Sequence, residues 1–322
     1  CLVGSEMCIR DSLVTLVFGG WLIAHGKMEA ADLAMYALYI GIFISPIQIL
    51  VELTEMMQKG LSGFRRFLDV IETEPDIQDA EDAKPLTNVC GDVSYENVSF
   101  HYQDDETPVL SHVSFRIPAG RSIALVGPSG SGKTTICSLL PRFYDVTEGK
   151  ITLDGVDIRN LSQHKLREVM GLVPQKGVLF SGTIASNIKL AGEDEISDET
   201  MKEAAQTAQA TEFIEAKDDK YETAIAQGGT NVSGGQKQRL AMIRMLAAEP
   251  QCILLDEPFS ALDPVTRGEL QNEIVKLQKY FKKTIVFVTH DMDEAIRLAD
   301  RVCIIQNGKI AQFDKPEEIL KH

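Results

Sequence analysis

The stretch Gly127-Pro128-Ser129-Gly130-Ser131-Gly132-Lys133-Thr134 decides the fold of this chain. An apolar run at residues 122–126 precedes it and another follows it, which predicts a buried strand, a tight loop and a helix. Glycines let backbone N–H groups wrap phosphates, and a helix N-terminus favours anions. We therefore expect this phosphate loop and the adjoining Thr135 to bind a nucleotide, with Lys133 on its β- and γ-phosphates and the Thr134 hydroxyl on Mg²⁺.

Two carboxylates, Asp256 and Glu257, follow a short apolar run that begins at Cys252. In phosphate-loop enzymes the first carboxylate after such a strand holds the Mg²⁺ shell. The second is then placed to orient or deprotonate the attacking water. A strand that ends in acids is common in any α/β protein, but the phosphate loop upstream favours the catalytic interpretation. We expect Asp256 to serve the metal and Glu257 to be catalytic.

The segment Val232-Ser233-Gly234-Gly235-Gln236 resembles the signature motif of ATP-binding-cassette (ABC) ATPases. With the phosphate loop, the resemblance covers residues 91–322 and implies an α/β P-loop NTPase domain of ABC type with a helical subdomain, which uses ATP and Mg²⁺. It also implies roles for four further residues. Tyr102 would stack on adenine, Gln175 would reach Mg²⁺ and take part in catalysis, Asp263 would lie in a loop that crosses a dimer, and His290 would contact the γ-phosphate.

The signature residues Ser233, Gly234 and Gly235 are expected at the start of a helix, where exposed N–H groups form an anion site. The resemblance implies that Gln236 binds the nucleotide with them. This site has no phosphate loop beside it in the sequence. In the family that the segment resembles, a second copy presents the site to the ATP held by the first. The resemblance therefore implies a head-to-tail dimer with a second half-transporter, either identical or different.

The N-terminal part of the chain is apolar. Residues 33–51 carry no charge over the length needed to cross a bilayer core, whereas the uncharged residues 13–24 are too short to span it alone. From Glu52 onward the apolar residues recur at helical spacing, which predicts one long helix that leaves the membrane with basic residues on its cytoplasmic flank. The alternative is a buried helical hairpin of a soluble protein.

These patterns predict four segments. Residues 1–12 resemble translated adaptor sequence and are expected to be non-native, and residues 13–72 are expected to end a truncated all-α transmembrane domain. Residues 73–90 are acidic, contain prolines and predict a linker, and residues 91–322 form the ATPase domain. We expect a multi-pass protein of the bacterial inner membrane with a cytoplasmic ATPase domain, of which the first four spans and most of the fifth are missing here.

Composition narrows the class of protein further. The chain has 322 residues and a formal net charge of −15, which argues against a nucleic-acid-binding surface. Its six cysteines are scattered without a Cys-x-x-Cys pair, so neither a disulfide framework nor a zinc site is suggested. Cys137 and Cys252 fall in apolar runs and are predicted to be small core residues.

Different parts of the chain resemble different ABC proteins. Residues 13–240 resemble bacterial exporters, in which membrane and ATPase domains share one chain, and residues 221–229 match their loop that meets a coupling helix. Residues 256–320 look like the ATPase subunit of osmoprotectant importers, because Asp-Met-Asp-Glu follows His290 where exporters carry Arg-Leu-Ser. A natural hybrid subfamily and a chimeric assembly, joined near residues 233–239, both account for this pattern.

The function expected from these features is ATP hydrolysis that drives export of an unidentified small molecule, lipid or peptide across the lipid bilayer. One alternative is an importer ATPase fused to a membrane segment. A soluble ABC ATPase and a nucleotide-binding regulator without turnover are further alternatives. Residues 33–51 argue against the soluble protein, and the presence of Glu257 and His290 argues against the regulator.

Overall fold

The computed structural model describes residues 2–80, 83, 86, 88–103, 107–190 and 196–321, and it describes side chains from residue 13 on except at 48, 277, 280 and 281. The chain divides into two compact units, Cys1–Asp76 and Ile77–His322.

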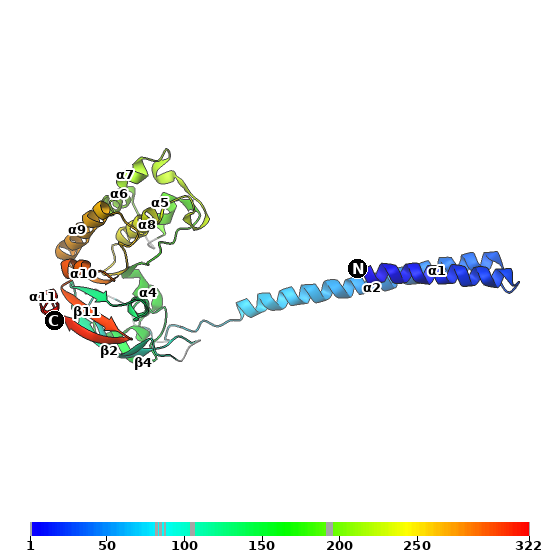
Figure 1. The fold of residues 1–322 in the computed structure, drawn as a ribbon, viewed down its shortest axis with the longest axis horizontal. Helices are drawn as coiled ribbons and strands as arrows, with labels where there is room; N and C mark the ends of the chain where they lie inside the picture. The colour runs from blue at the N-terminus through cyan, green and yellow to red at the C-terminus, as the bar shows by residue number, and fades with distance from the viewer. Residues whose placement is uncertain are drawn as a thin grey trace. The chain divides into compact units, whose positions relative to one another are not determined.

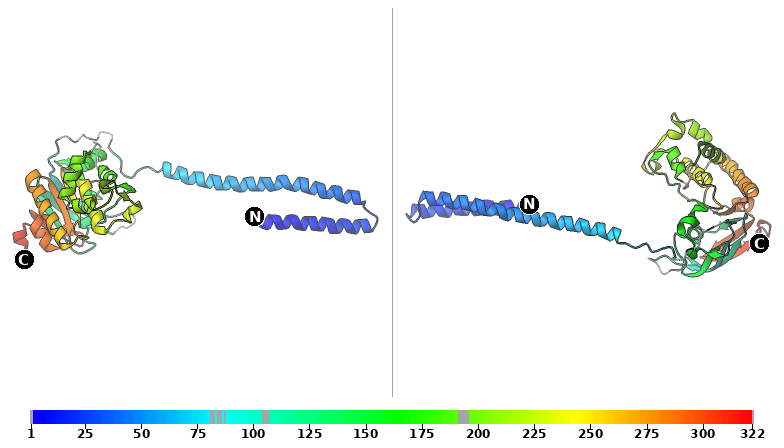
Figure 2. Two further views of the ribbon diagram at one scale, coloured as in Figure 1. Left: turned by 90° about the horizontal axis from the view of Figure 1, so that it is seen from above. Right: turned by 180° about the vertical axis from the view of Figure 1, so that it is seen from behind.

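The first unit consists of two helices, α1 (Leu2–Ala24) and α2 (Ala30–Ile71). α1 runs alongside the N-terminal part of α2 (Figure 1, Figure 2), and a Cβ atom on Gly19 would lie 2.2 Å from Leu33 Cδ1. Glycine allows such a close approach between apolar helices. α2 continues over 42 residues, which confirms the single long helix expected from the apolar spacing. Residues 2–12 form the first part of α1.

Both helices expose large apolar side chains, among them Val17 and Phe43. Within the described part of the chain, α2 is the one helix that is long and apolar enough to cross a membrane. The apolar portion of α1, Leu13–Ala24, is shorter than a span.

The second unit is built on a six-stranded sheet in the order β12-β11-β3-β10-β9-β6. All neighbouring strands in it are parallel except the β11–β12 pair. β3, β9 and β10 are buried along their whole length, which explains their largely apolar sequences. The strands are β3 (Ser122–Val126), β6 (Met170–Val173), β9 (Cys252–Asp256), β10 (Thr284–Thr289), β11 (Arg301–Gln306) and β12 (Lys309–Asp314).

The strand order places the predicted site at one edge of this sheet. β10 lies between β3 and β9, with Thr289 opposite Val126 and Val288 opposite Asp256. The carboxyl ends of the three parallel strands therefore meet, and ligands of open α/β sheets bind beyond such ends. The phosphate loop, Glu257 and His290 follow these strands directly, and Asp256 is the last residue of β9.

A second, antiparallel sheet has the order β2-β1-β4-β5 and shares a core with one face of the first. Cys137 and Cys252 are 2% and 1% exposed in this core, which confirms their prediction as core residues. The strands are β1 (Val93–Phe100), β2 (Leu110–Ile117), β4 (Glu148–Leu153) and β5 (Val156–Asp157), and the helices of this part are α3 (Lys133–Leu139), η1 (Ile158–Asn160) and α4 (Gln163–Glu168).

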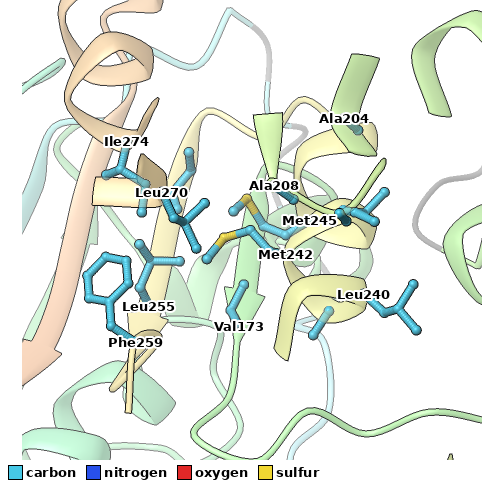
Figure 3. Close-up of a cluster of buried hydrophobic side chains, with 14 of the residues drawn as sticks. Val173, Ala204, Ala208, Leu240, Met242, Met245, Leu255, Phe259, Leu270 and Ile274 are labelled. Atoms are coloured by element: carbon cyan, nitrogen blue, oxygen red, sulfur yellow. The ribbon is translucent and has the colours of Figure 1, made fainter. Parts of the chain in front are cut away.

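Helices α5 to α8 gather in a separate lobe (Figure 1). Figure 3 shows Met242 and Met245 of α8 in the apolar core that also contains Leu255 of β9 and Leu270 of α9. This core joins the lobe to the six-stranded sheet, so the α/β domain with a helical subdomain is confirmed. The remaining elements are α5 (Ile184–Lys189), α6 (Asp198–Thr207), α7 (Thr211–Glu215), α8 (Gly234–Ala247), α9 (Pro264–Phe281), α10 (Met292–Leu298), α11 (Pro316–Ile319), β7 (Gly182–Thr183), β8 (Ala224–Ile225), η2 (Lys220–Glu222) and η3 (Gln227–Gly229).

Candidate functional site

The phosphate loop connects β3 to α3, as its flanking sequences predict. Gly132 has a φ of +98°, and a Cβ atom there would lie 2.6 Å from Leu110 Cδ2, so this position requires glycine. Lys133 is buried, and its Nζ donates hydrogen bonds to the carbonyl oxygens of Gly127 (2.8 Å) and Pro128 (2.7 Å). Burial lowers the pKa of the Lys133 amine, although the nearby carboxylates oppose this shift. The ammonium group therefore lies inside the loop that would receive the phosphates.

Thr134 and Asp256 come together from α3 and β9. The Thr134 hydroxyl donates to Asp256 Oδ1 over 3.2 Å, and Asp256 is 5% exposed. Burial raises the pKa of the Asp256 carboxyl, and the charge of Glu257 adds to this effect, whereas the Thr134 hydrogen bond and Lys133 oppose it. A buried carboxylate of this kind is costly without a cation.

Glu257 stands between two of the other predicted residues. Gln175 Nε2 donates to Glu257 Oε2 over 3.0 Å, and His290 Nδ1 lies 3.6 Å from the same oxygen. The backbone of Glu257 has a φ of +45°, a left-handed conformation that costs a residue with a side chain about 1–2 kcal/mol. The Glu257 N–H donates to Val288 O over 3.0 Å, which anchors the strained residue to β10.

The structure thus gathers six predicted residues at the carboxyl edge of the sheet. They are Lys133, Thr134, Gln175, Asp256, Glu257 and His290. No hydrogen bond or ion pair joins residues 233–236 to the phosphate loop within the described parts of the chain.

Tyr102 lies next to the start of α3, where its hydroxyl is 3.1 Å from Thr135 Oγ1. Its ring meets Phe100 and Tyr144 edge to face, with centroid distances of 4.9 Å and 5.2 Å. Tyr102 is half-buried and Tyr144 is 43% exposed. Tyr144 was not predicted from the sequence, because an aromatic residue in a turn carries no distinguishing spacing.

The signature residues begin α8, as predicted. Ser233 is its N-cap: Gln236 N donates to Ser233 Oγ (3.2 Å) and Ser233 N donates to Gln236 Oε1 (3.0 Å). Ser233 and Gly234 are exposed, so the N-terminus of α8 is open to solvent. A Cβ atom on Gly235 would lie 2.9 Å from Ala261 O, so the helix start packs against the loop that leads to Asp263.

Asp263 caps the next helix, α9, and accepts a hydrogen bond from Thr266 N over 3.0 Å. That backbone hydrogen bond lowers the pKa of the exposed Asp263 carboxyl. The loop that carries Asp263 therefore links the starts of α8 and α9.

Three buried polar residues behind His290 were missed from the sequence. They are Thr289, Gln271 and Glu294, which are 2%, 5% and 8% exposed. Glu294 lies on the buried side of α10 beside Ala295. The available signal was Glu294 itself, a charged residue next to apolar ones near the start of a short helix. Its partner on α9, Gln271, is too far away in the sequence to be inferred.

Comparisons with known proteins agree with this geometry. Residues 110–260 match the family model described as ABC transporter. The chain is 36% identical over 310 residues to an uncharacterized ABC transporter ATP-binding protein, YwjA, of Bacillus subtilis, with 96% of this chain and 53% of the relative covered. It is 37% identical over 319 residues to the mitochondrial iron-sulfur clusters transporter atm1 of Aspergillus fumigatus, which covers 98% of this chain and 44% of that protein.

The chain carries an ABC transporter domain. It is also 36% identical over 303 residues to an ATP-dependent lipid A-core flippase of Desulfotalea psychrophila, with 94% of this chain and 52% of the relative covered. A solved structure of a bacterial Atm1-family ABC exporter with ATP bound matches with a TM-score of 0.78 and 30% identity, over 98% of this chain and 56% of that one.

These matches confirm the predicted ABC-type ATPase domain and its resemblance to exporters. The chain spans about half the length of the curated relatives it matches. The match to the exporter structure covers 98% of this chain and so includes most of residues 256–320, and the importer alternative gains no better support.

Proposed function

We propose that this chain hydrolyses ATP and that Glu257 activates the attacking water. The observation that carries this proposal is the hydrogen bond from Gln175 Nε2 to Glu257 Oε2 beside the Thr134–Asp256 pair. Gln175 occupies one carboxylate oxygen of Glu257, which leaves Oε1 to accept a proton from water. His290, whose Nδ1 lies 3.6 Å from Glu257 Oε2, would then contact the γ-phosphate.

The residues present fit a Mg²⁺ ion. Thr134, Asp256 and Gln175 offer a hydroxyl, a carboxylate and an amide oxygen, which are the hard oxygen donors that Mg²⁺ prefers. Burial desolvates the Asp256 carboxylate and raises its pKa, so a cation would relieve that cost. When bound, Mg²⁺ would neutralise charge on the terminal phosphates. Gln175 can serve both centres, because its amide nitrogen faces Glu257 while its oxygen remains available.

The remaining residues of the phosphate loop would bind ATP through backbone N–H groups, and Lys133 would exchange its carbonyl partners for phosphate oxygens. Tyr102 would present its ring to adenine, since base stacking needs little hydrogen-bond specificity. Tyr144, which meets Tyr102 edge to face, would hold that ring in place.

The active form would be a dimer of two half-transporters. Ser233 and the exposed N-terminus of α8 form an anion site. Within the chain, Ser233 bonds to Gln236 and leaves the helix end open to a second subunit. The ATP of each subunit would lie between its own phosphate loop and the signature residues of its partner.

The first unit would anchor the ATPase domain to a membrane. α2 is long and apolar enough to span a bilayer, and its apolar side chains are exposed. The relatives include an ATP-dependent lipid A-core flippase and an iron-sulfur clusters transporter, and the matching solved structure is that of an ABC exporter. We therefore propose a multi-pass exporter with a cytoplasmic ATPase domain, whose cargo is a small molecule, lipid or peptide.

Mixing two inactive variants tests this proposal. Ser233→Arg would block the anion site and Lys133→Ala would disable the phosphate loop, so each chain alone in detergent should lack ATPase activity. An equal mixture should recover about a quarter of the wild-type rate, because about half of the dimers are mixed and each holds one intact composite site. Absence of recovery under conditions where the subunits exchange would contradict the dimer, and full activity of Ser233→Arg alone would contradict the role of the signature residues.

A further inference from the structure

A buried polar cluster lies directly behind His290. Glu294 of α10 accepts a hydrogen bond at each carboxylate oxygen: Thr289 Oγ1 donates to Oε2 over 2.7 Å, and Gln271 Nε2 donates to Oε1 over 3.1 Å. Arg297 donates to Gln271 Oε1 over 3.1 Å, so the amide of Gln271 is fixed at both ends. The cluster links β10, α10 and α9.

The cluster holds both sides of His290. Thr289, immediately before it, also accepts a hydrogen bond from the backbone N–H of Asp291, immediately after it, over 3.0 Å. The Thr289 hydroxyl therefore fixes the backbone on both sides of His290, and it donates its own hydrogen bond to Glu294. A small cavity of about 90 Å³ is lined by Glu257, His290 and Glu294 among others. Any movement of Glu294 would therefore reach the site through Thr289.

The burial of Glu294 calls for an explanation. A carboxyl that is 8% exposed and bonded to two neutral side chains gains little stability over an apolar residue. Such a group does fix geometry, because each donor has one acceptor in the correct place. Asp263 is the N-cap of α9, so the same cluster ties His290 to the helix that follows the loop beside the signature residues.

We propose that Glu294 is a positioning residue for His290. It orients the Thr289–Asp291 peptide so that the imidazole meets the γ-phosphate, and Gln271 transmits the position of α9 to this peptide. This inference rests on the proposed function, in which His290 contacts the γ-phosphate.

The donor pattern gives a specific test. In Glu294→Gln, the new amide nitrogen faces Gln271 Nε2, and turning the Gln271 amide would place its nitrogen against Arg297 instead. Both arrangements oppose two donors. Turning the new amide at position 294 instead would let its nitrogen donate to Thr289 Oγ1, but the Thr289 hydroxyl hydrogen would then lose its acceptor. The exchange Glu294→Gln with Gln271→Glu restores the pattern. The amide oxygen at position 294 then accepts from Thr289, while the carboxylate at position 271 accepts from the amide nitrogen at position 294 and from Arg297.

The measurement compares AMP-PNP, which has a γ-phosphoryl group, with ADP, which lacks it, as ligands of the full chain in detergent. Glu294→Gln should weaken AMP-PNP binding by about tenfold while ADP affinity stays within about twofold, since a hydrogen bond to a charged group has that order of magnitude. His290→Ala should give the same pattern, and adding Glu294→Gln to His290→Ala should have no further effect. The exchange variant should recover the wild-type ratio of affinities.

Controls separate positioning from folding. Glu318→Gln, at an exposed carboxylate paired with Lys321, should leave both affinities unchanged. If circular dichroism shows that Glu294→Gln is unfolded, Thr289→Val and Thr289→Ser replace it: Val should lose the AMP-PNP preference and Ser should keep it. Any of three results would overturn the inference. The first is an unchanged ratio of AMP-PNP to ADP affinity in a folded Glu294→Gln or Thr289→Val variant. The others are independent effects of Glu294→Gln and His290→Ala, and no recovery of the ratio in a folded exchange variant. If His290→Ala itself leaves the ratio unchanged, the proposed role of His290 fails, and this inference fails with it.

Discussion

Ser233 is expected to have two separable roles, as the N-cap of α8 and as a contact for the ATP of a second subunit. Ser233→Ala removes the oxygen that accepts from Gln236 N over 3.2 Å, and loss of an N-cap costs about 1 kcal/mol. For a domain of this size, the unfolding temperature should fall by about 2–4 °C. Ser233→Asp should keep or slightly raise the unfolding temperature, because Asp caps as well as Ser and its charge complements the helix dipole.

The order of ATPase activities should differ from the order of stabilities. Ser233→Ala loses one hydrogen bond to a charged phosphate, which corresponds to a decrease in rate of about 10- to 100-fold. Ser233→Asp places a carboxylate against the phosphates and should be less active still, although it is the more stable variant. The assays are thermal unfolding by circular dichroism and phosphate release at saturating Mg-ATP.

A second helix provides the matched control. Ser197 caps α6 and accepts from Thr200 N over 3.1 Å, so Ser197→Ala should lower the unfolding temperature by a similar amount. It should not change the ATPase rate beyond what stability explains. If the activity of the Ser233 variants follows their stability, with Ser233→Asp as active as the wild type, Ser233 is a cap alone and the reasoning is refuted.

Two further predictions concern Asp256 and Tyr102. Because burial raises the folded-state pKa of Asp256, its contribution to stability is present below the unfolded-state pKa and is lost as the pH rises through the folded-state value. Asp256→Asn should therefore unfold at a higher temperature than the wild type at neutral pH in EDTA, and this difference in unfolding temperature should shrink in acid. Mg-ATP should raise the unfolding temperature of the wild type alone. A loss of stability in Asp256→Asn that does not depend on pH would contradict this prediction. Tyr102→Ala should weaken ATP binding by about 10- to 100-fold, as loss of one base stack does. Binding of inorganic tripolyphosphate should stay unchanged, and Tyr102→Phe should bind ATP nearly as the wild type does. An equal loss of affinity for ATP and for tripolyphosphate would contradict adenine stacking.

Much of the site could be predicted because its residues lie in short contiguous segments that follow buried strands. The phosphate loop and the Asp256–Glu257 pair needed only their flanking apolar runs, and the strand order then brought them together. The N-cap role of Ser233 is also local, since Gln236 follows at the spacing of a capping box.

Other features depend on contacts between distant segments, which a single sequence does not contain. Gln271 and Glu294 meet only because α9 and α10 pack together. The left-handed backbone of Glu257 is a further example, because it depends on the acceptor at Val288 in the neighbouring strand. The sequence also does not indicate that the Lys133 amine donates hydrogen bonds to carbonyl groups of its own loop.

The central claim is that Glu257 activates the attacking water but is not required for ATP binding. Steady-state phosphate release by Glu257→Gln, measured with Mg-ATP on the full chain alongside Glu318→Gln, tests this claim most directly. We predict that the rate falls by about 10²- to 10⁴-fold, as expected for loss of a general base, while ATP binding is retained and Glu318→Gln behaves as the wild type. Near-normal hydrolysis by Glu257→Gln would contradict the account.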